Sequence, residues 1–204
     1  MRRDKFSQKP KTLTRLENTR KLRRFLIVCE GEKTEPNYFR KFPENPEVFD
    51  RIDIHGTGYN TISLVNEAIR LKDEALKRKE PYIEVWCVFD KDDFPVEQFR
   101  NAIMLAGRNK IKCAYSIEAF ELWYLLHFNF YDAALSRDQY GEKLSELLGK
   151  KYQKNDGEMY QALIKRQSTA IQNARKLYTL QHKRPLIEQN PITTVFWLVE
   201  RLLP

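Results

Sequence analysis

Short apolar runs alternate with longer amphipathic segments between residues 25 and 117, and this alternation constrains the fold more than any other feature. The runs occupy residues 25–29, 52–55, 83–89 and 111–117. Continuous short runs rich in β-branched and aromatic side chains are typical of strands buried on both faces of a sheet. The intervening segments have helical apolar spacing. The order β-α-β-α-β-α-β predicts an α/β fold, with a Rossmann-like parallel sheet of about four strands flanked by helices.

The apolar spacing becomes helical after residue 117 and stays so to residue 203. Helices are predicted for segments 118–128, 143–148, 158–180 and 192–203. Residues 150–157 are polar and predict a mobile loop. We therefore divide the chain into a leader of residues 1–22, an α/β domain of residues 23–128, and a helical extension of residues 129–204 that packs on the same domain.

Positive charge is concentrated at the start of the chain. The net charge is +8, and residues 1–24 alone contain ten Lys or Arg residues against two acidic ones. The rest of the chain is therefore neutral overall. Two interpretations of this basic, partly disordered leader stay open. It is either a solvated tail or an arm that binds nucleic-acid phosphates and adds affinity without sequence specificity.

Several classes of protein are disfavoured by what the sequence lacks. No apolar run is long enough to span a membrane, and the basic start has no apolar core of a signal peptide. Cys29, Cys87 and Cys113 fall in predicted strands, which indicates reduced core thiols in a cytoplasmic protein. There is no Cys-x-x-Cys pair for a structural zinc site and no P-loop motif.

Acidic residues follow two of the predicted strands. Glu30 and Glu32 follow the first, whereas Asp90, Asp92 and Asp93 follow the third. Strands of a parallel sheet end at one edge, so Glu30 and Asp90 would lie close together if these strands are neighbours. Asp90 and Asp92 would project to the same side because strand side chains alternate. Such carboxylates suit Mg²⁺ (or Mn²⁺), although aspartates at strand ends also cap helices and form turns.

Other candidate site residues are supported by less specific sequence patterns. Gly31 would let the backbone turn tightly and approach a ligand. Residues 56–58, Gly-Thr-Gly, form either an ordinary turn or a phosphate site at a helix N-terminus. Glu121 lies in an otherwise apolar helix, where a carboxylate is costly unless it meets polar partners or a metal. His127 is more typical of a packing histidine than of a ligand.

Four blocks of the sequence together resemble the RloB family, which belongs to bacterial restriction and abortive-phage-defence loci. The blocks are Val28-Cys29-Glu30-Gly31-Glu32-Lys33-Thr34-Glu35 with Tyr38-Phe39, then Phe89-Asp90-Lys91-Asp92-Asp93, then Phe120-Glu121-Leu122-Trp123 with His127-Phe128, and finally Asn190-Pro191 with Thr193, Val195 and Leu198-Val199-Glu200. The resemblance runs from about residue 23 to residue 204. It implies a partner, because these proteins are commonly encoded beside a large AAA/ABC-type ATPase.

The same resemblance implies a Toprim-like fold, the metal-dependent fold of topoisomerases, primases and some nucleases. By this resemblance Glu30 acts as general acid/base or as a metal ligand, Asp90 and Asp92 hold Mg²⁺, and Glu121 completes the site. One departure is Ser116-Ile117-Glu118-Ala119, where the family pattern has a Ser-Asn-Pro-like sequence. It puts a site role for Glu118 in doubt and makes the position of Glu121 less certain.

The function that these residues predict is Mg²⁺-dependent cleavage of nucleic-acid phosphodiesters, in RNA (including tRNA) or DNA, in anti-phage defence. Gly31, Lys33 and Lys91 would contact the substrate. One alternative is a non-catalytic Toprim-like interaction subunit of a defence ATPase complex. Another is a phosphoaspartate switch or phosphatase with Asp90 as acceptor, which the absence of a convincing Lys and Thr partner block disfavours. Homo-oligomerisation stays open.

Overall fold

The computed structural model describes residues 22–91 and 95–203. The predicted leader, except Leu22, and Asp92 therefore lie outside the described residues. The strands are β1 (Arg24–Cys29), β2 (Arg51–Gly56), β3 (Tyr82–Lys91) and β4 (Lys112–Ile117). The helices between them are α1 (Thr34–Phe39), α2 (Thr61–Lys77) and α3 (Val96–Arg108). After β4 come α4 (Glu121–Leu125), α5 (Arg137–Leu148), α6 (Met159–Leu163), η1 (Ile164–Arg166), α7 (Gln167–Gln181), η2 (Leu186–Glu188) and α8 (Val195–Leu202).

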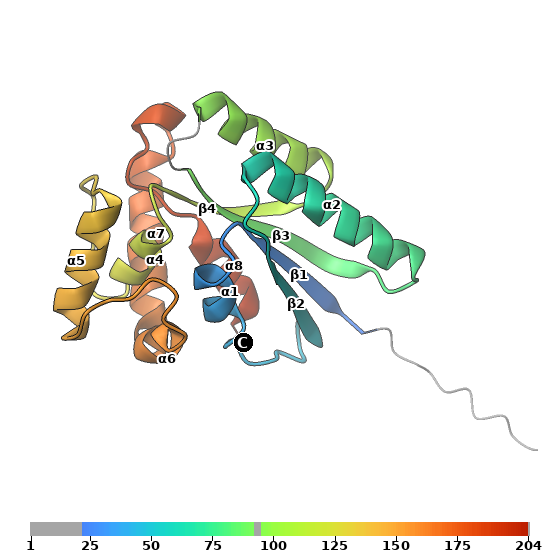
Figure 1. Ribbon diagram of the computed structural model, residues 1–204, viewed down its shortest axis with the longest axis horizontal. Helices are drawn as coiled ribbons and strands as arrows, with labels where there is room; N and C mark the ends of the chain where they lie inside the picture. Colours follow the sequence, from blue (N-terminus) through green and yellow to red (C-terminus); the bar gives the residue numbers. More distant parts are fainter. Residues whose placement is uncertain (1–21, 92–94, 204) are drawn as a thin grey trace, which may run out of the picture.

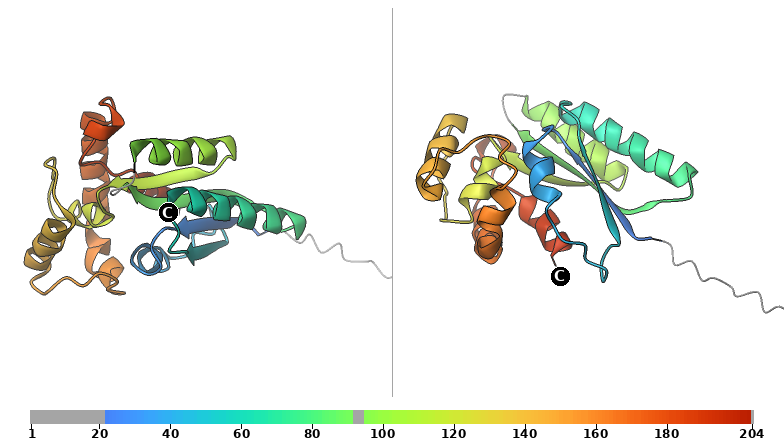
Figure 2. Two further views of the ribbon diagram at one scale, coloured as in Figure 1. Left: turned by 45° about the horizontal axis from the view of Figure 1, so that its top comes forward. Right: turned by 60° about the horizontal axis from the view of Figure 1, so that its bottom comes forward.

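The four strands form one sheet in the order β2-β1-β3-β4, and every pair is parallel. The predicted α/β fold with C-terminal helices is confirmed, and β1 and β3 are neighbours. Figure 1 shows the strands running toward the end of the sheet where α4 to α7 gather. Figure 2 shows α2 and α3 lying side by side along one face of the sheet. The strand ends and helices α4 to α7 thus meet at one end of the molecule (Figure 1).

Side chains of β1 alternate between two apolar cores, as the period of a strand requires. Phe25 and Ile27 enter the larger core, which contains α1 and the C-terminal helices. Leu26 and Val28 enter the smaller core beneath α2 and α3. All four side chains are fully buried, which explains why the run is continuously apolar.

The C-terminal helices differ from their predicted lengths. Segment 118–128 holds only the short helix α4, because Glu118 has a left-handed backbone with φ of 80° and cannot lie in a right-handed helix. Helix α5 begins earlier than predicted, at a capping box between Ser136 and Gln139. It ends at Gly149, whose φ of 65° suits a C-cap glycine. Segment 158–180 divides into α6, η1 and α7.

A buried hydrogen-bond network joins the sheet domain to the extension. The Tyr38 hydroxyl accepts from Trp123 Nε1 at 2.9 Å and from Gln167 Nε2 at 2.7 Å. His127 contacts the Trp123 carbonyl at 2.9 Å and Gln167 Oε1 at 3.3 Å. Burial lowers the pKa of His127 to about 4. His127 is therefore a neutral packing residue within this network.

The structure also shows the environment of the three cysteines and the character of the helices. Cys29 and Cys87 are buried free thiols, and Cys113 is half-buried. The three lie in β1, β3 and β4, as predicted. Among the described residues, no helix combines the length and the apolar character needed to cross a membrane.

Candidate functional site

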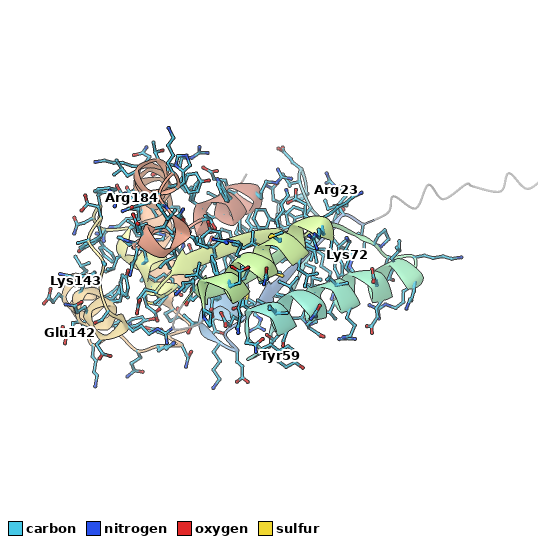
Figure 3. The ribbon with its side chains drawn as sticks, turned by 90° about the horizontal axis from the view of Figure 1, so that it is seen from above. Arg23, Tyr59, Lys72, Glu142, Lys143 and Arg184 are labelled. Atoms are coloured by element: carbon cyan, nitrogen blue, oxygen red, sulfur yellow. The ribbon has the colours of Figure 1, made fainter. Side chains whose placement is uncertain are left out.

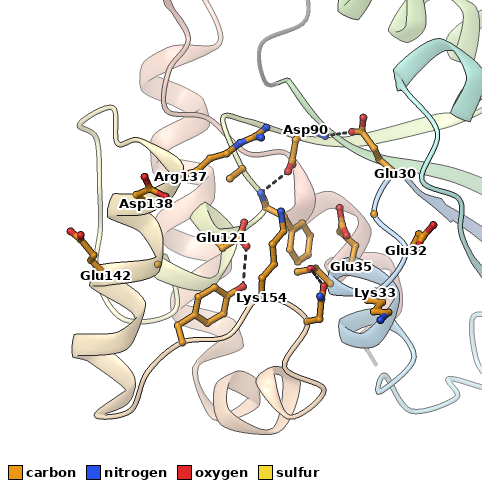
Figure 4. A pocket seen from close by; sticks show the side chains of 17 residues that line it. Glu30, Glu32, Lys33, Glu35, Asp90, Glu121, Arg137, Asp138, Glu142 and Lys154 are labelled. Carbon is orange, nitrogen blue, oxygen red and sulfur yellow. Dashed lines mark hydrogen bonds between the residues drawn. The ribbon is translucent and has the colours of Figure 1, made fainter.

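A cleft of about 1030 Å³ opens at the carboxyl ends of β1 and β3 (Figure 4). The sheet domain contributes the turn after β1, Asp90 and the start of α4, and the extension contributes α5 and the segment before α6. The lining residues with charged side chains are Glu30, Glu32, Lys33, Glu35, Asp90, Glu121, Arg137, Asp138, Glu142 and Lys154. The predicted residues Glu30, Gly31, Lys33, Asp90 and Glu121 thus share one cleft, whereas Lys91 is not part of its lining.

Glu30 and Asp90 meet at the ends of their strands. The Glu30 amide donates to the Val88 carbonyl at 2.9 Å, which continues the β1–β3 pairing by one residue. The Glu30 carboxylate accepts from the Asp90 amide at 3.0 Å. The side chain of Glu30 is therefore hydrogen-bonded to the backbone of Asp90. This contact is possible because β1 and β3 are neighbours in the sheet.

The Gly-Thr-Gly turn after β2 supports the turn after β1. Thr57 donates from its amide to the Cys29 carbonyl at 3.1 Å, and Gly58 donates to the Glu30 carbonyl at 2.8 Å. A Cβ on Gly56 would lie 2.7 Å from the Glu32 carbonyl oxygen, so no larger residue fits there. Residues 56–58 thus hold the acidic turn in place, which agrees with the structural interpretation of this motif.

Asp90 lies at the end of β3 in the floor of the cleft. Its Oδ2 accepts from the Phe120 amide at 3.0 Å. Although part of the residue is exposed to the cleft, desolvation raises the pKa of its carboxyl well above the usual range. The neighbouring carboxylates of Glu35, Glu121 and Glu30 raise this pKa further. The charges are crowded enough that a cation or proton would stabilise them.

Glu35 is a member of this cluster that the sequence argument missed. It lies in the first turn of α1 and is 5% exposed. Burial raises the pKa of its carboxyl, and Glu121 raises it further. Its Oε2 is buried without a hydrogen-bond partner among the described residues. A Cβ on Gly31 would lie 2.2 Å from that oxygen, so the glycine makes room for the carboxylate.

Glu121 begins α4 and is nearly buried, at 8% exposure. The Tyr152 hydroxyl donates to Glu121 Oε1 at 3.0 Å. Burial, together with the negative charge of Glu121, raises the pKa of Tyr152 above its usual range. A polar partner thus offsets part of the cost of burying Glu121.

The segment of residues 150–157, expected to be mobile, packs against α1. Thr34 Oγ1 donates to Asn155 Oδ1 at 2.9 Å, and Asn37 Nδ2 donates to the Asn155 carbonyl at 3.3 Å. These contacts place Lys154 in the cleft lining. Its charge opposes the rise in the pKa of Glu35. The segment is therefore a wall of the cleft.

Two cations of the extension extend into the cleft. In Figure 4 the side chains of Arg137 and Lys154 point toward Asp90. Arg137 Nε also donates to the Glu118 carbonyl at 3.3 Å. Lys91, in contrast, belongs to β3, and its carbonyl accepts from the Glu118 amide at 2.9 Å. Positive charge in the cleft thus comes from Arg137, Lys154 and Lys33, two of which the sequence argument missed.

The carboxylates offer the hard oxygen ligands that Mg²⁺ and Mn²⁺ prefer, and one or two with water suffice for Mg²⁺. The unpaired buried oxygen of Glu35 fits such an ion. In residues 22–91 and 95–203, however, no group of three or more His, Cys, Asp or Glu side chains is arranged to hold a metal. Asp92, predicted as a ligand with Glu30 and Asp90, lies outside these ranges.

A protein-family model described as RloB-like protein matches residues 25–202, which is most of the chain. No curated protein matches this sequence, and neither does any solved structure.

Proposed function

This chain belongs to the RloB-like family, and we propose that it is a divalent-metal-dependent nuclease that cleaves phosphodiester bonds of RNA or DNA. The observation that carries this proposal is the burial of Glu35 and Glu121 around Asp90, in a cleft with Arg137 and Lys154. Crowded carboxylates bind a divalent cation, and cations beside them bind phosphate. A nucleic-acid phosphate would bind both the metal ion held by the carboxylates and the neighbouring cations.

The chain's own residues divide the chemistry between them. Asp90 and one of its buried neighbours, Glu35 or Glu121, would hold Mg²⁺ or Mn²⁺ with water, together with Asp92. When bound, the ion would act as a Lewis acid and neutralise charge on the scissile phosphate. Glu30, held at the Asp90 amide, would accept a proton from the attacking water.

Positive charge would position the substrate. Arg137 and Lys154 would bind its phosphate oxygens, and Lys33 and the Gly31 backbone would contact it at the turn after β1. The extension would thereby add phosphate contacts to those of the sheet domain. A Toprim-like assignment of the sheet is part of the same proposal.

The proposed setting rests on the resemblance described from the sequence. We place the protein in the cytoplasm as an effector of bacterial anti-phage defence, with an AAA/ABC-type ATPase as partner. The competing possibility is a non-catalytic Toprim-like subunit of such an ATPase complex. The two differ in whether any nucleic acid is cut.

The test is a cleavage assay with purified protein, with and without the partner ATPase, on labelled RNA and DNA in Mg²⁺ or Mn²⁺. We expect Glu30→Gln and Asp90→Asn to lower the rate by roughly 100-fold or more. Asp73→Asn, on the exposed side of α2, is the matched control and should cut like wild type. Unaltered cleavage by Asp90→Asn would remove the site assignment. Cleavage by no preparation, with partner or without, would support the non-catalytic subunit.

A further inference from the structure

A second surface of the extension is strongly basic. Between Glu158 and Glu188 the chain contains no acidic residue. Its cations there are Lys165, Arg166, Arg175, Lys176, Lys183 and Arg184. Arg175 pairs with Glu200 at 2.6 Å, whereas the other five form no ion pair within the described part of the chain. This excess of unpaired positive charge favours a polyanionic partner.

Aromatic rings accompany these cations. Residues 128–131, between α4 and α5, present three half-buried rings, and each has a cation over its face. The pairs are Arg166 over Phe128 at 4.6 Å, Lys176 over Phe130 at 4.1 Å, and Lys143 over Tyr131 at 5.9 Å from the ring centroid. Such pairs shield half-buried rings from water, but Arg166 and Lys176 are themselves exposed. Their outer sides are available to a ligand.

The cations of two of these pairs, Arg166 and Lys176, lie in or next to one helix, α7. Arg166, the last residue of η1, immediately precedes α7, and Asn173 and Lys176 follow it at helical spacing on that helix. Asn173 Nδ2 donates to the Leu126 carbonyl at 2.8 Å and fixes the segment after α4 against this helix. A hollow of about 430 Å³ beside Arg166 is lined also by Phe128 and Thr169. Figure 3 shows Arg184 and Lys143 at the same end of the molecule, away from Arg23.

We propose that this cation–aromatic surface, formed by Phe128, Phe130, Tyr131, Lys143, Arg166 and Lys176, binds single-stranded nucleic acid. Unpaired bases expose flat faces that stack on aromatic rings and on guanidinium planes, whereas a duplex hides those faces. The charges of Arg166 and the lysines would also neutralise backbone phosphates. A hollow next to a stacked Arg–Phe pair accommodates a base better than it accommodates a rigid double helix.

This inference goes beyond the proposed nuclease, because none of the six residues lines the acidic cleft. The segment that carries the rings nevertheless connects α4, which begins with Glu121, to α5, which begins with Arg137. A nucleic acid bound here would thus contact the segment that joins two elements of the cleft. Binding on this surface requires no metal and no cleavage.

The test is fluorescence anisotropy of the full-length protein with a short labelled single strand, RNA or DNA, in EDTA. We expect the double variant Arg166→Gln/Lys176→Gln to bind about tenfold more weakly. The slope of log K against log salt should fall by about 1.4, since each lost phosphate contact on a single strand accounts for ~0.7. The matched control is Lys77→Gln/Arg108→Gln, with the same charge change on α2 and α3, and it should keep most of the affinity.

Three outcomes would overturn the proposal. They are equal loss in the two double variants, unchanged affinity in Arg166→Gln/Lys176→Gln, and tighter binding of a duplex than of a single strand. Thermal melting checks the fold, and the single changes at these two exposed side chains serve if the double variant is unstable. Measurement in the Asp90→Asn background separates this surface from the cleft, since the double variant should weaken binding by the same factor there as in the wild-type background.

Discussion

The Tyr152 hydroxyl donates a hydrogen bond of 3.0 Å to the carboxylate of Glu121. The two residues come from different parts of the fold, one from the segment between α5 and α6 and the other from the start of α4. Because Glu121 also raises the pKa of Asp90, this hydroxyl acts on the whole acidic cluster. The extension therefore helps to set the charge of the cleft.

Tyr152→Phe removes the hydroxyl donor and keeps the aromatic ring. We expect about 1.5 kcal/mol less stability, because a hydrogen bond to a charged group is lost, and about tenfold slower cleavage with little change in KM. Urea unfolding and single-turnover kinetics measure the two effects. Tyr160→Phe is the control, since this buried tyrosine donates no hydrogen bond to another described residue. Equal losses in both variants would contradict a role for the Glu121 contact.

His127 should make the fold sensitive to acid. Its pKa is lowered from 6.5 to about 4 in the folded protein, chiefly by burial. Between these values the unfolded chain binds more protons, so stability is lost as the pH falls from 6.5 toward 4. The loss amounts to about 3 kcal/mol in total, and His127→Gln should flatten this part of the profile. If the free energy of unfolding of wild type and of His127→Gln changed with pH in parallel, the role of His127 would be contradicted.

Gly56→Ala should destabilise the protein and impair the cleft together. Its Cβ would lie 2.7 Å from the Glu32 carbonyl oxygen and 2.8 Å from that of Gly31, both of them backbone atoms. We expect a cost of about 1–3 kcal/mol and slower cleavage, because the acidic turn must shift. Gly107→Ala in α3 is the control: its Cβ meets nothing within 4 Å, so the change should stabilise by roughly 0.5–1 kcal/mol. Thermal denaturation compares the two.

Asp90→Asn should stabilise the metal-free protein at neutral pH. The pKa of Asp90 is raised by burial and by its acidic neighbours. Stability therefore falls as the pH rises from the ordinary value of about 3.9 toward the raised pKa. Asn keeps an oxygen for the Phe120 amide without the charge, so a gain of about 1 kcal/mol is expected, shrinking toward pH ~4.

Divalent cations should reverse this order. Mg²⁺ at a hundredfold excess over its Kd would stabilise wild type by ~2.7 kcal/mol and leave Asp90→Asn unchanged. Thermal melts in EDTA and in Mg²⁺ measure both effects. Equal Mg²⁺ shifts in the two proteins would show that the ion binds elsewhere.

The arrangement of the strands was accessible from the sequence because each apolar run is short, continuous and buried on both faces. Parallel strands must end at one edge, so the sequence alone predicts that Glu30 and Asp90 lie close together. The roles of these two acids stay predictions. The position of Asp92 lies outside the described residues.

Glu35, Arg137 and Lys154 could not be found in the same way. Nothing local distinguishes Glu35 from a solvated acid in the first turn of a helix. Its burial arises from tertiary packing, and a Lys in a polar segment looks like surface. The available hint was that Glu35 stands in the same short block as Glu30 and Gly31. The positions of these three side chains depend on packing between segments that are distant in the sequence. The spacing of apolar residues carries no information about such packing.

The hydrogen bond between Thr34 and Asn155 joins residues 121 positions apart. The cleft therefore requires both the sheet domain and the extension and cannot be transferred with either one alone. The sheet domain expressed alone would keep its acids but lose Lys154, Arg137 and the tyrosine donor, and its buried carboxylates would open to water. Chain insertions between α5 and α6, where loops commonly tolerate them, should here abolish activity before they unfold the protein.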